Sequence, residues 1–360
     1  MIISSAIHSA MKMYLKSSLL LLFSFLLLTS SSLIAQVFEN AGQYMDHIGK
    51  ANQLLTEKYL VYLSGMSHGK SARKVEKRRM EVLQAISDTR FTIMGMPPYK
   101  GDRTLKDTTV AYLKILNSVF NEDYGKIVNM EEIAEQSYDG MEAYILAQQK
   151  ANEKLQQASV RQNEMQKQFA AKHNITIIEN ESVSEAKMKI AGEVMKHYND
   201  VYLIFFKAYK QEAYLMDALN QKKVNSIEQN LNSLQSFSEQ GLDKLKDLKG
   251  YSNDGSLIIA CRNLLNFYKE EAKKSSAMTD FFLKEENFAK LKKQFDAKSG
   301  SKRTQQDIDQ FNKAVNDIND ASNAFNAVNN DLNKQRNNTL NGWNNAVKKF
   351  MDEYIPTQKR

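Results

Sequence analysis

The sequence predicts an all-α protein, an elongated tandem of two duplicated, antiparallel four-helix-bundle-like units with long spine helices. Three observations lead to this fold class. The chain has no proline between Tyr99 and Ile355, and residues that favour helix dominate that stretch. Apolar residues recur there at helical spacing. One long segment also returns later in the chain, which indicates two related halves.

The segment that returns begins at Lys150 and carries one apolar stripe. Residues 150–159 match residues 313–322 at an offset of 163. The stripe residues of the two copies are Ala151, Leu155, Ala158, Met165 and Phe169, and Ala314, Ile318, Ala321, Val328 and Leu332. Shorter matches in the same order, such as Tyr99 with Tyr251 and Asp102 with Asp254, have an offset of 152. We predict an internal duplication, and helical periodicity alone is the alternative explanation.

Residues 1–35 have the features of a Sec signal peptide. Lys12 and Lys16 precede an apolar run over residues 19–28, and a Ser-rich stretch ends in Leu33-Ile34-Ala35. The run is shorter than the roughly 20 apolar residues that a transmembrane helix needs. We therefore expect cleavage after Ala35, export to the periplasm or cell surface, and no transmembrane span after cleavage.

Cysteine content and charge narrow the class of protein further. Cys261 is the only cysteine and lies far from the cleavage site, so we expect neither a lipoprotein nor an intrachain disulfide. Its apolar neighbours predict a buried side chain that fills space in the core. Removing Lys12 and Lys16 lowers the formal charge from +7 to +5, because the signal peptide has no acidic residue. This weak, dispersed charge argues against a nucleic-acid partner.

The first predicted unit covers residues 36–173. We expect helices over about residues 38–66 and 71–94, separated by Ser67-His68-Gly69. Pro97 and Pro98 end the second helix, and Asp102 is the expected N-cap of a third helix that reaches about Phe120. A long fourth helix follows to about residue 172, with a kink near Asp139-Gly140.

The second predicted unit covers residues 183–360, after an extended linker over residues 174–182 that is rich in β-branched side chains. Helices are expected over about residues 183–219, 224–248, 257–272, 279–295 and 304–354. A helix of about 50 residues would be about 75 Å long, which predicts an elongated molecule. Coiled-coil-like antiparallel packing is the expected arrangement within each unit.

No catalytic motif is recognisable in the sequence, and we predict neither an enzyme nor a cofactor. Glu-x-x-His, the signature of a di-metal bundle site, does not occur. The weak metal-binding candidates are His47 and His197, which the proposed repeat makes equivalent, together with Glu193 one turn before His197. Ordinary surface histidines are the alternative interpretation.

Two basic segments are candidates for contact with an anionic partner. The first opens the second helix and comprises Lys70, Arg73, Lys74, Lys77, Arg78 and Arg79. Cations at a helix N-terminus oppose the helix dipole, and an anionic partner surface would compensate for this cost. A solvated helix face is the alternative interpretation. The second comprises Lys290, Lys292, Lys293, Lys298, Lys302 and Arg303.

Two further patterns have both a structural and a functional interpretation. Tyr198, Tyr202, Phe205 and Tyr209 form an aromatic stripe that indicates core packing, with an apolar ligand pocket as the alternative. Asparagines are frequent from Asn312 to Asn345 although asparagine is a poor helix former. We interpret them as a solvated face, and a polar helix-pairing surface is the alternative.

The end of the signal peptide, Ile34-Ala35-Gln36, the four-helix repeat and the segment at residues 281–288 together resemble an uncharacterised family of exported all-helical surface proteins from spirochaetes and Gram-negative bacteria. The resemblance implies a periplasmic or cell-surface location and no catalytic residues. We therefore predict an extracytoplasmic binding or structural module whose ligand is an unknown protein or envelope polymer. The alternatives are a helical carrier or enzyme that holds metal, haem or lipid, and peripheral attachment to an anionic envelope surface.

Overall fold

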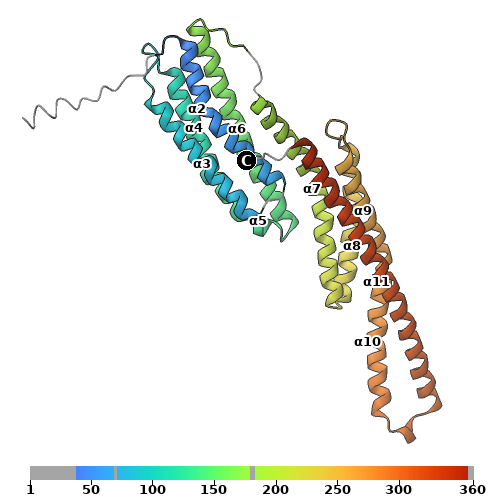
Figure 1. The fold of residues 1–360 in the computed structure, drawn as a ribbon. Coiled ribbons are helices and arrows are strands. Elements are labelled where there is room, and N and C mark those ends of the chain that lie inside the picture. Colours follow the sequence, from blue (N-terminus) through green and yellow to red (C-terminus); the bar gives the residue numbers. More distant parts are fainter. Residues whose placement is uncertain (1–37, 69–70, 179–182, 356–360) are drawn as a thin grey trace, which may run out of the picture.

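A computed structural model of the protein describes residues 38–68, 71–178 and 183–355. The predicted signal peptide lies outside these ranges. Within them the chain is helical and contains no β-strand, which confirms the predicted all-α class. Figure 1 shows two groups of helices that follow one another along an elongated molecule. None of the described helices is long and apolar enough to cross a membrane.

The first unit is a bundle of four helices, the third of which is composite. Its elements are α2 (Ala41–Ser67), α3 (Ala72–Gly95), α4 (Thr104–Ser118), η1 (Val119–Asp123), α5 (Tyr124–Ala134) and α6 (Tyr138–Lys172). Side-chain caps fix two of the starts, because Asn40 accepts a hydrogen bond from the Gln43 amide and Ser137 accepts one from Gly140.

The boundary between the third and fourth helices differs from the sequence prediction. The third helix continues past Phe120 through one turn of π-helix, η1, and ends at Ala134. The break lies just before Ser137, so the predicted kink at Asp139-Gly140 is wrong, because those residues form the first turn of α6. Asp102 is not the N-cap either, since Arg103 holds that position, but its Oδ1 accepts a hydrogen bond from the Thr104 amide.

The second unit has the helices that the sequence predicts, and each end lies within three residues of the predicted one. They are α7 (Val183–Asn220), α8 (Val224–Asp247), α9 (Ser256–Lys274), α10 (Ser276–Ala297), the short η2 (Gly300–Lys302) and α11 (Gln305–Tyr354). Ser275 alone separates α9 from α10. A complete capping box between Thr304 and Asp307 starts α11. Between the units, Asn174 is a turn residue and residues 175–178 are neither helix nor strand. Residues 179–182 of the predicted linker lie outside the described residues.

Aromatic side chains fill the centre of the first unit. Tyr62, Phe120 and Tyr124 are buried and contact one another with ring centroids 5.1–5.8 Å apart. Tyr44 and Phe169 form a second contact nearer the start of α2, at 5.7 Å. Each fully buried large side chain of this kind contributes roughly 1.5 to 3 kcal/mol.

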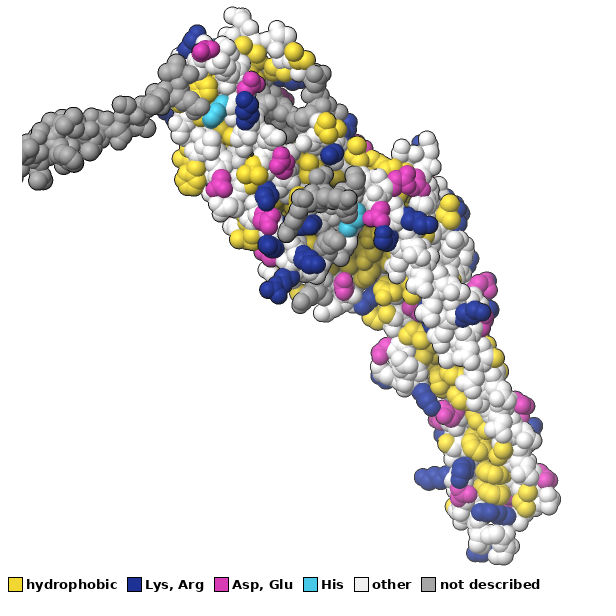
Figure 2. Space-filling model, in the orientation of Figure 1, with side chains coloured by type: hydrophobic (Ala, Val, Ile, Leu, Met, Phe, Trp, Pro, Cys, Tyr) yellow, Lys and Arg dark blue, Asp and Glu magenta, His cyan; other side chains and the backbone are white. Residues whose placement is uncertain are grey.

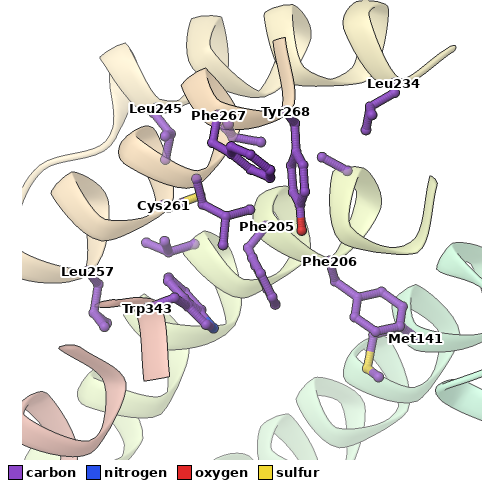
Figure 3. Packing of buried hydrophobic residues seen from close by; sticks show 14 of the residues in the cluster. Met141, Phe205, Phe206, Leu234, Leu245, Leu257, Cys261, Phe267, Tyr268 and Trp343 are labelled. Atoms are coloured by element: carbon purple, nitrogen blue, oxygen red, sulfur yellow. The ribbon is translucent and has the colours of Figure 1, made fainter. Parts of the chain in front are cut away.

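The core of the second unit is built around the only tryptophan of the chain. Trp343 of α11 stacks on Phe205 of α7 at 4.5 Å, and Figure 3 shows both beside Cys261 and Tyr268 of α9. Helices α7, α8 and α9 approach closely at Gly241, because a Cβ there would lie 2.9 Å from a methyl group of Leu265. This close approach explains a glycine inside a helix.

The hydrophobic core of the second unit includes residues of the first unit, so the boundary between the cores does not coincide with the linker in the sequence. Ala134, Met141 and Ile145, from the corner between α5 and α6, pack with the hydrophobic residues of the second unit. In Figure 3, Phe206 of α7 points toward Met141. The corner of the first bundle is therefore covered by the second.

Polar contacts complete the joint between the units. Ser67 Oγ, at the end of α2, lies 3.3 Å from the sulfur of Met195. His68 Nε2 lies 3.4 Å from the carboxylate of Asp352 on α11. The joint thus connects the end of α2 with both the start and the end of the second unit.

The same turn occurs before the third helix of each unit. Tyr99 bridges to Asp102, and Tyr251 bridges to Asp254, each across two residues with positive φ. The Asp254 carboxylate accepts a hydrogen bond from the Ser256 amide at 2.7 Å, as Asp102 does from Thr104 at 2.9 Å. The matches at offset 152 thus have equivalent local geometry.

The last helices are related by a different offset from the predicted 163. Phe169 packs on Tyr99 at 5.9 Å, and Phe350 packs on Tyr251 at 6.1 Å, so Phe350 and not Leu332 occupies the equivalent position. The offset between these phenylalanines is 181. The physical reason is length: α11 has 50 residues and α6 has 35, because α10 and α11 extend beyond the second bundle.

Candidate functional site

A buried cluster of charged side chains joins three helices of the second unit. It consists of Glu212 on α7, Glu271 on α9 and Arg336 on α11, and we call it the Glu–Arg–Glu cluster. Arg336 donates through Nε to Glu212 and through Nη2 to Glu271. The two glutamates are only 4% and 1% exposed. A planar guanidinium holds two carboxylates in fixed directions, so the cluster fixes the relative positions of the three helices.

The cluster has two carboxylates for one guanidinium, which makes one of them prone to protonation. Burial, reinforced by the charge of Glu212, raises the pKa of Glu271 to about 7. Burial also raises the pKa of Glu212. Glu271 Oε2 is buried and has no hydrogen-bond partner. Glu271 therefore binds a proton near neutral pH. Its unpaired oxygen, Oε2, is the atom available for that proton.

Three hydroxyl groups continue the polar row from Glu271. The side-chain oxygens of Tyr268, Ser275 and Thr279 are buried and unpaired. Their spacing of three or four residues places them on one face of α9 and the start of α10. The sequence interpretation did not identify this row, although the signal was present as polar residues at positions of an apolar helical stripe that includes Leu264.

The Glu–Arg–Glu cluster does not form a metal centre. Among the described residues no group of three or more His, Cys, Asp or Glu side chains is placed to hold a metal ion. The chemistry available to the cluster is ion pairing and the uptake or release of one proton.

The candidate metal ligands lie in different environments. The His47 ring packs on Phe38 at 5.5 Å in the first unit, whereas His197 packs on Phe350 at 5.7 Å in the second. Burial lowers the pKa of His197. Glu193 hydrogen-bonds to Tyr251.

The arrangement of the units keeps the two histidines apart. Ser67 touches Met195, only two residues from His197. His47 lies twenty residues before Ser67 on the same helix, which corresponds to about 30 Å. The histidines do not meet because the bundles join end to end and do not face each other.

The first basic segment is partly used inside the fold. Arg79 is 7% exposed and pairs with Glu76 at 2.7 Å, and Arg78 donates to the Val61 carbonyl at 2.9 Å. Lys70 lies outside the described residues, and Arg73, Lys74 and Lys77 are exposed. The expectation that Arg79 belongs to a surface patch is therefore wrong.

Arg79 has a local reason to be buried. Its Nη1 donates to the carbonyl of Phe120, in the π-helical turn η1. The guanidinium thus adds a side-chain donor to a backbone carbonyl of this π-helical turn. A polar groove of about 560 Å³ lies over this turn, lined by Glu76, Arg79, Asn121, Glu122, Gly125, Lys126, Val128 and Asn129. The groove mixes both signs of charge and selects neither anions nor cations.

The second basic segment is also engaged in local contacts. Lys290, Lys292 and Lys298 pair with Glu286, Asp296 and Asp307, each at 2.6 Å. The Arg303 guanidinium lies 4.1 Å from the centre of the Phe295 ring. These contacts neutralise much of the charge that the sequence suggested as an anionic-partner surface.

The aromatic stripe of α7 and the lone cysteine are core elements. Phe205 and Phe206 are buried, and Tyr202 contacts both. Cys261 is 0% exposed, and burial raises the pKa of its thiol to about 12. The prediction that Cys261 is buried is confirmed.

The end of the α10–α11 hairpin forms an arm, which we define as residues 286–320. Lys222, in the turn between α7 and α8, pairs with Glu285 and marks the level at which the second bundle ends. Beyond it, Phe288 and Phe295 both pack on Phe311, at 5.8 and 4.3 Å. All three rings remain partly exposed because only two helices enclose the seam. Figure 1 shows the arm projecting past α7 and α8, and Figure 2 shows a hydrophobic strip along it.

Comparisons with known proteins found no matching family model, no similar curated protein and no similar solved structure. The resemblance to exported helical surface proteins remains a sequence-based prediction. Any functional assignment therefore depends on the geometry of this chain.

Proposed function

We propose that this protein is a non-catalytic, extracytoplasmic binding or structural module that uses the arm to contact a protein or an envelope polymer. The observation that carries this proposal is the arm itself. Two antiparallel helices extend about 24 Å past the second bundle, at 1.5 Å per residue over residues 305–320. A hairpin of this kind adds little to the core but places a long surface away from the rest of the molecule.

The seam of the arm supports the proposal. Two helices cannot enclose the rings of Phe288, Phe295 and Phe311 completely, so an apolar strip stays accessible. Accessible apolar strips bordered by polar residues are typical of binding surfaces. The extracytoplasmic location is supported by the sequence features of residues 1–35.

The test uses cysteines introduced one at a time into the full chain in its native cells. Lys293→Cys places a thiol on the arm, and Lys244→Cys places a matched exposed thiol on α8. Cys261 can remain, because a buried thiol with a raised pKa does not react. A membrane-impermeant maleimide that carries a photocrosslinker should give adducts from position 293 and not from position 244. No labelling in intact cells, or equal adducts from both positions, would contradict the proposal.

We further infer that the two units arose by duplication. The equivalent Tyr-x-x-Asp turns, the phenylalanine packed on each turn tyrosine and the shared order of helices support this origin. In this view the arm is a later extension of one copy, since it accounts for the greater length of α11. Variants that remove the arm should then leave a second bundle that folds by itself.

A further inference from the structure

A stripe of asparagines follows the outer side of α11 with a strict seven-residue repeat. From residue 312 onward, steps of alternately four and three residues meet asparagine at nine of ten positions, and Leu340 is the exception. The members of this Asn stripe are Asn312, Asn316, Asn319, Asn323, Asn326, Asn330, Asn333, Asn337 and Asn344. The stripe begins in the arm and continues along the second bundle, for about 48 Å.

The fold does not account for this choice of residue. Eight members are exposed, and within the described part of the chain none of these eight takes part in a side-chain hydrogen bond. Asn333 is the exception, since it accepts a hydrogen bond from Arg336. Asparagine is a poor helix former, and exposed helix positions usually carry residues that favour helix. Eight exposed amides without a side-chain hydrogen bond therefore oppose helix formation without any gain in packing.

The stripe keeps a constant position on the hairpin. The seam residues Phe311, Ile318, Phe325 and Leu332 also recur every seven residues. Because both patterns share one period, the Asn stripe stays on the same flank of the seam along the whole helix. Charged residues of α11, such as Asp317 and Asp320, fall on the opposite flank. Figure 2 shows surface that is neither charged nor hydrophobic running along α11 beside the hydrophobic strip of the arm.

We propose that the Asn stripe binds a neutral, hydroxyl-rich polysaccharide along α11. This inference rests on the proposed binding function of the arm and names the chemistry of its partner. An amide offers one acceptor and two donor hydrogens, and a sugar hydroxyl is itself both donor and acceptor. The stripe carries no charge, so it has nothing to offer an ionic polymer.

The geometry suits an extended polymer and not a compact ligand. Equivalent asparagines recur about every 10.5 Å, roughly the length of two sugar rings, so each pair of rings meets the same set of amides. The partly exposed phenyl rings of Phe288 and Phe311 lie in the adjacent seam and provide apolar surface for the faces of sugar rings. A partner helix is disfavoured, because a face of asparagines buries little apolar area.

The experiment uses the full chain with cellulose, chitin and an insoluble β-1,3-glucan as probes. The stripe variant N316A/N319A/N323A/N326A/N330A is compared with N338A/N345A, which removes two exposed asparagines from the other flank of the same helix. Because alanine favours helix, the stripe variant should fold with a Tm raised by roughly 5 °C or more. Loss of binding in this variant therefore cannot come from unfolding.

The inference predicts retention of the wild-type chain on at least one probe in 1 M NaCl, at least tenfold weaker retention of the stripe variant and unchanged retention of the control. Retention that disappears in 1 M NaCl would indicate ionic binding and overturn it. It is also overturned if no probe retains the wild-type chain, or if both variants behave alike. Adducts from the Lys293→Cys chain, together with such a result, would leave the binding function standing and remove only the polysaccharide.

Discussion

The two units of this protein solve the same packing problem with different side chains. In the first unit, tyrosines and phenylalanines fill the centre, and its buried arginine, Arg79, pairs with a glutamate that is 37% exposed. In the second unit, Arg336 holds two glutamates that are almost fully buried. The first unit thus keeps part of its ion pair in water, whereas the second buries two carboxylates with one guanidinium, a set that is neutral only when one carboxylate is protonated. The same fold therefore gives two units with different sensitivity to mutation and to pH.

The largest expected effect comes from removing the arginine of the second unit. Arg336→Ala leaves Glu212 and Glu271 buried without a counter-charge, which should cost about 3 to 5 kcal/mol of unfolding free energy. Arg79→Ala should cost only about 1 to 2 kcal/mol, because Glu76 regains water. Urea unfolding followed by the fluorescence of Trp343 measures the loss in the second unit, since the chain has no other tryptophan. Circular dichroism, which also reports the helices of the first unit, measures the loss caused by Arg79→Ala.

A triple replacement serves as the control for this comparison. E212Q/E271Q/R336M removes all three charges and should recover most of the lost stability, because no unpaired ion remains. Equal losses for Arg336→Ala and Arg79→Ala would show that the two arginines have the same energetic role and would contradict the difference in burial as its cause.

The pH dependence of the second unit gives the next largest effect. The raised pKa of Glu271, about 7, means that the folded state holds a proton that the unfolded chain has released. The stability of the second unit should therefore fall as pH rises from about 5 to 8, by about 2 kcal/mol. Glu271→Gln should abolish this slope in denaturant titrations followed by Trp343. A slope that persists in E271Q would assign the proton to another group.

The first unit should show the opposite response, in a more acidic range. A hydrogen bond from Lys172 and another from the Thr104 amide hold the pKa of Asp102 well below its usual value. A lowered folded-state pKa stabilises the protein above about pH 4, and this stability is lost as pH falls further. Asp102→Asn should remove this acid-sensitive part and cost about 1 kcal/mol at pH 7. Denaturant unfolding followed by circular dichroism at pH 2 to 7 measures this change in stability. Asp254→Asn, in the equivalent turn of the second unit, is the matched control.

The smallest effect is expected from the arm. Its rings pack on one another, so replacing residues 286–320 by a short Gly-Ser loop should change the Tm of either unit by less than about 2 °C. Differential scanning calorimetry compares this deletion with Phe205→Ala, which removes the ring stacked on Trp343 and should cost about 3 kcal/mol or more. A large loss of stability on deletion would make the arm part of the core.

Periodicity in the sequence was enough to predict the class of fold and most helix ends. The end of the helix predicted over residues 224–248 and the start of the one predicted over residues 304–354 each lie within one residue of the observed ends of α8 and α11. The π-helical turn was not predicted, and its Phe120 carbonyl accepts a hydrogen bond from Arg79 of another helix. Local sequence carries no information about that distant partner.

The candidate site was harder to predict than the fold. Glu212, Glu271 and Arg336 are separated by 59 and 65 residues, and only the packing of α7, α9 and α11 brings them together. For the first basic segment, the high density of charge along the chain suggested that all its residues lie on the surface. A helix directs successive residues to different sides, so Arg73, Lys74 and Lys77 are exposed whereas Arg79 is buried. The asparagines were visible in the sequence, but their common flank appears only when the seam is known.

The wide turn of the third helix also has an evolutionary consequence. Five residues there span a turn that closes with i→i+5 bonds, so η1 accommodates one residue more than a regular turn. Deleting a single residue such as Asn121 should convert the π-helical turn into a regular α-helical turn. The side chains of α4 and α5 would then keep the faces that they present to the core. Homologous chains that differ by one residue at this point would therefore be structurally interchangeable, provided that they also lack the arginine that caps the Phe120 carbonyl.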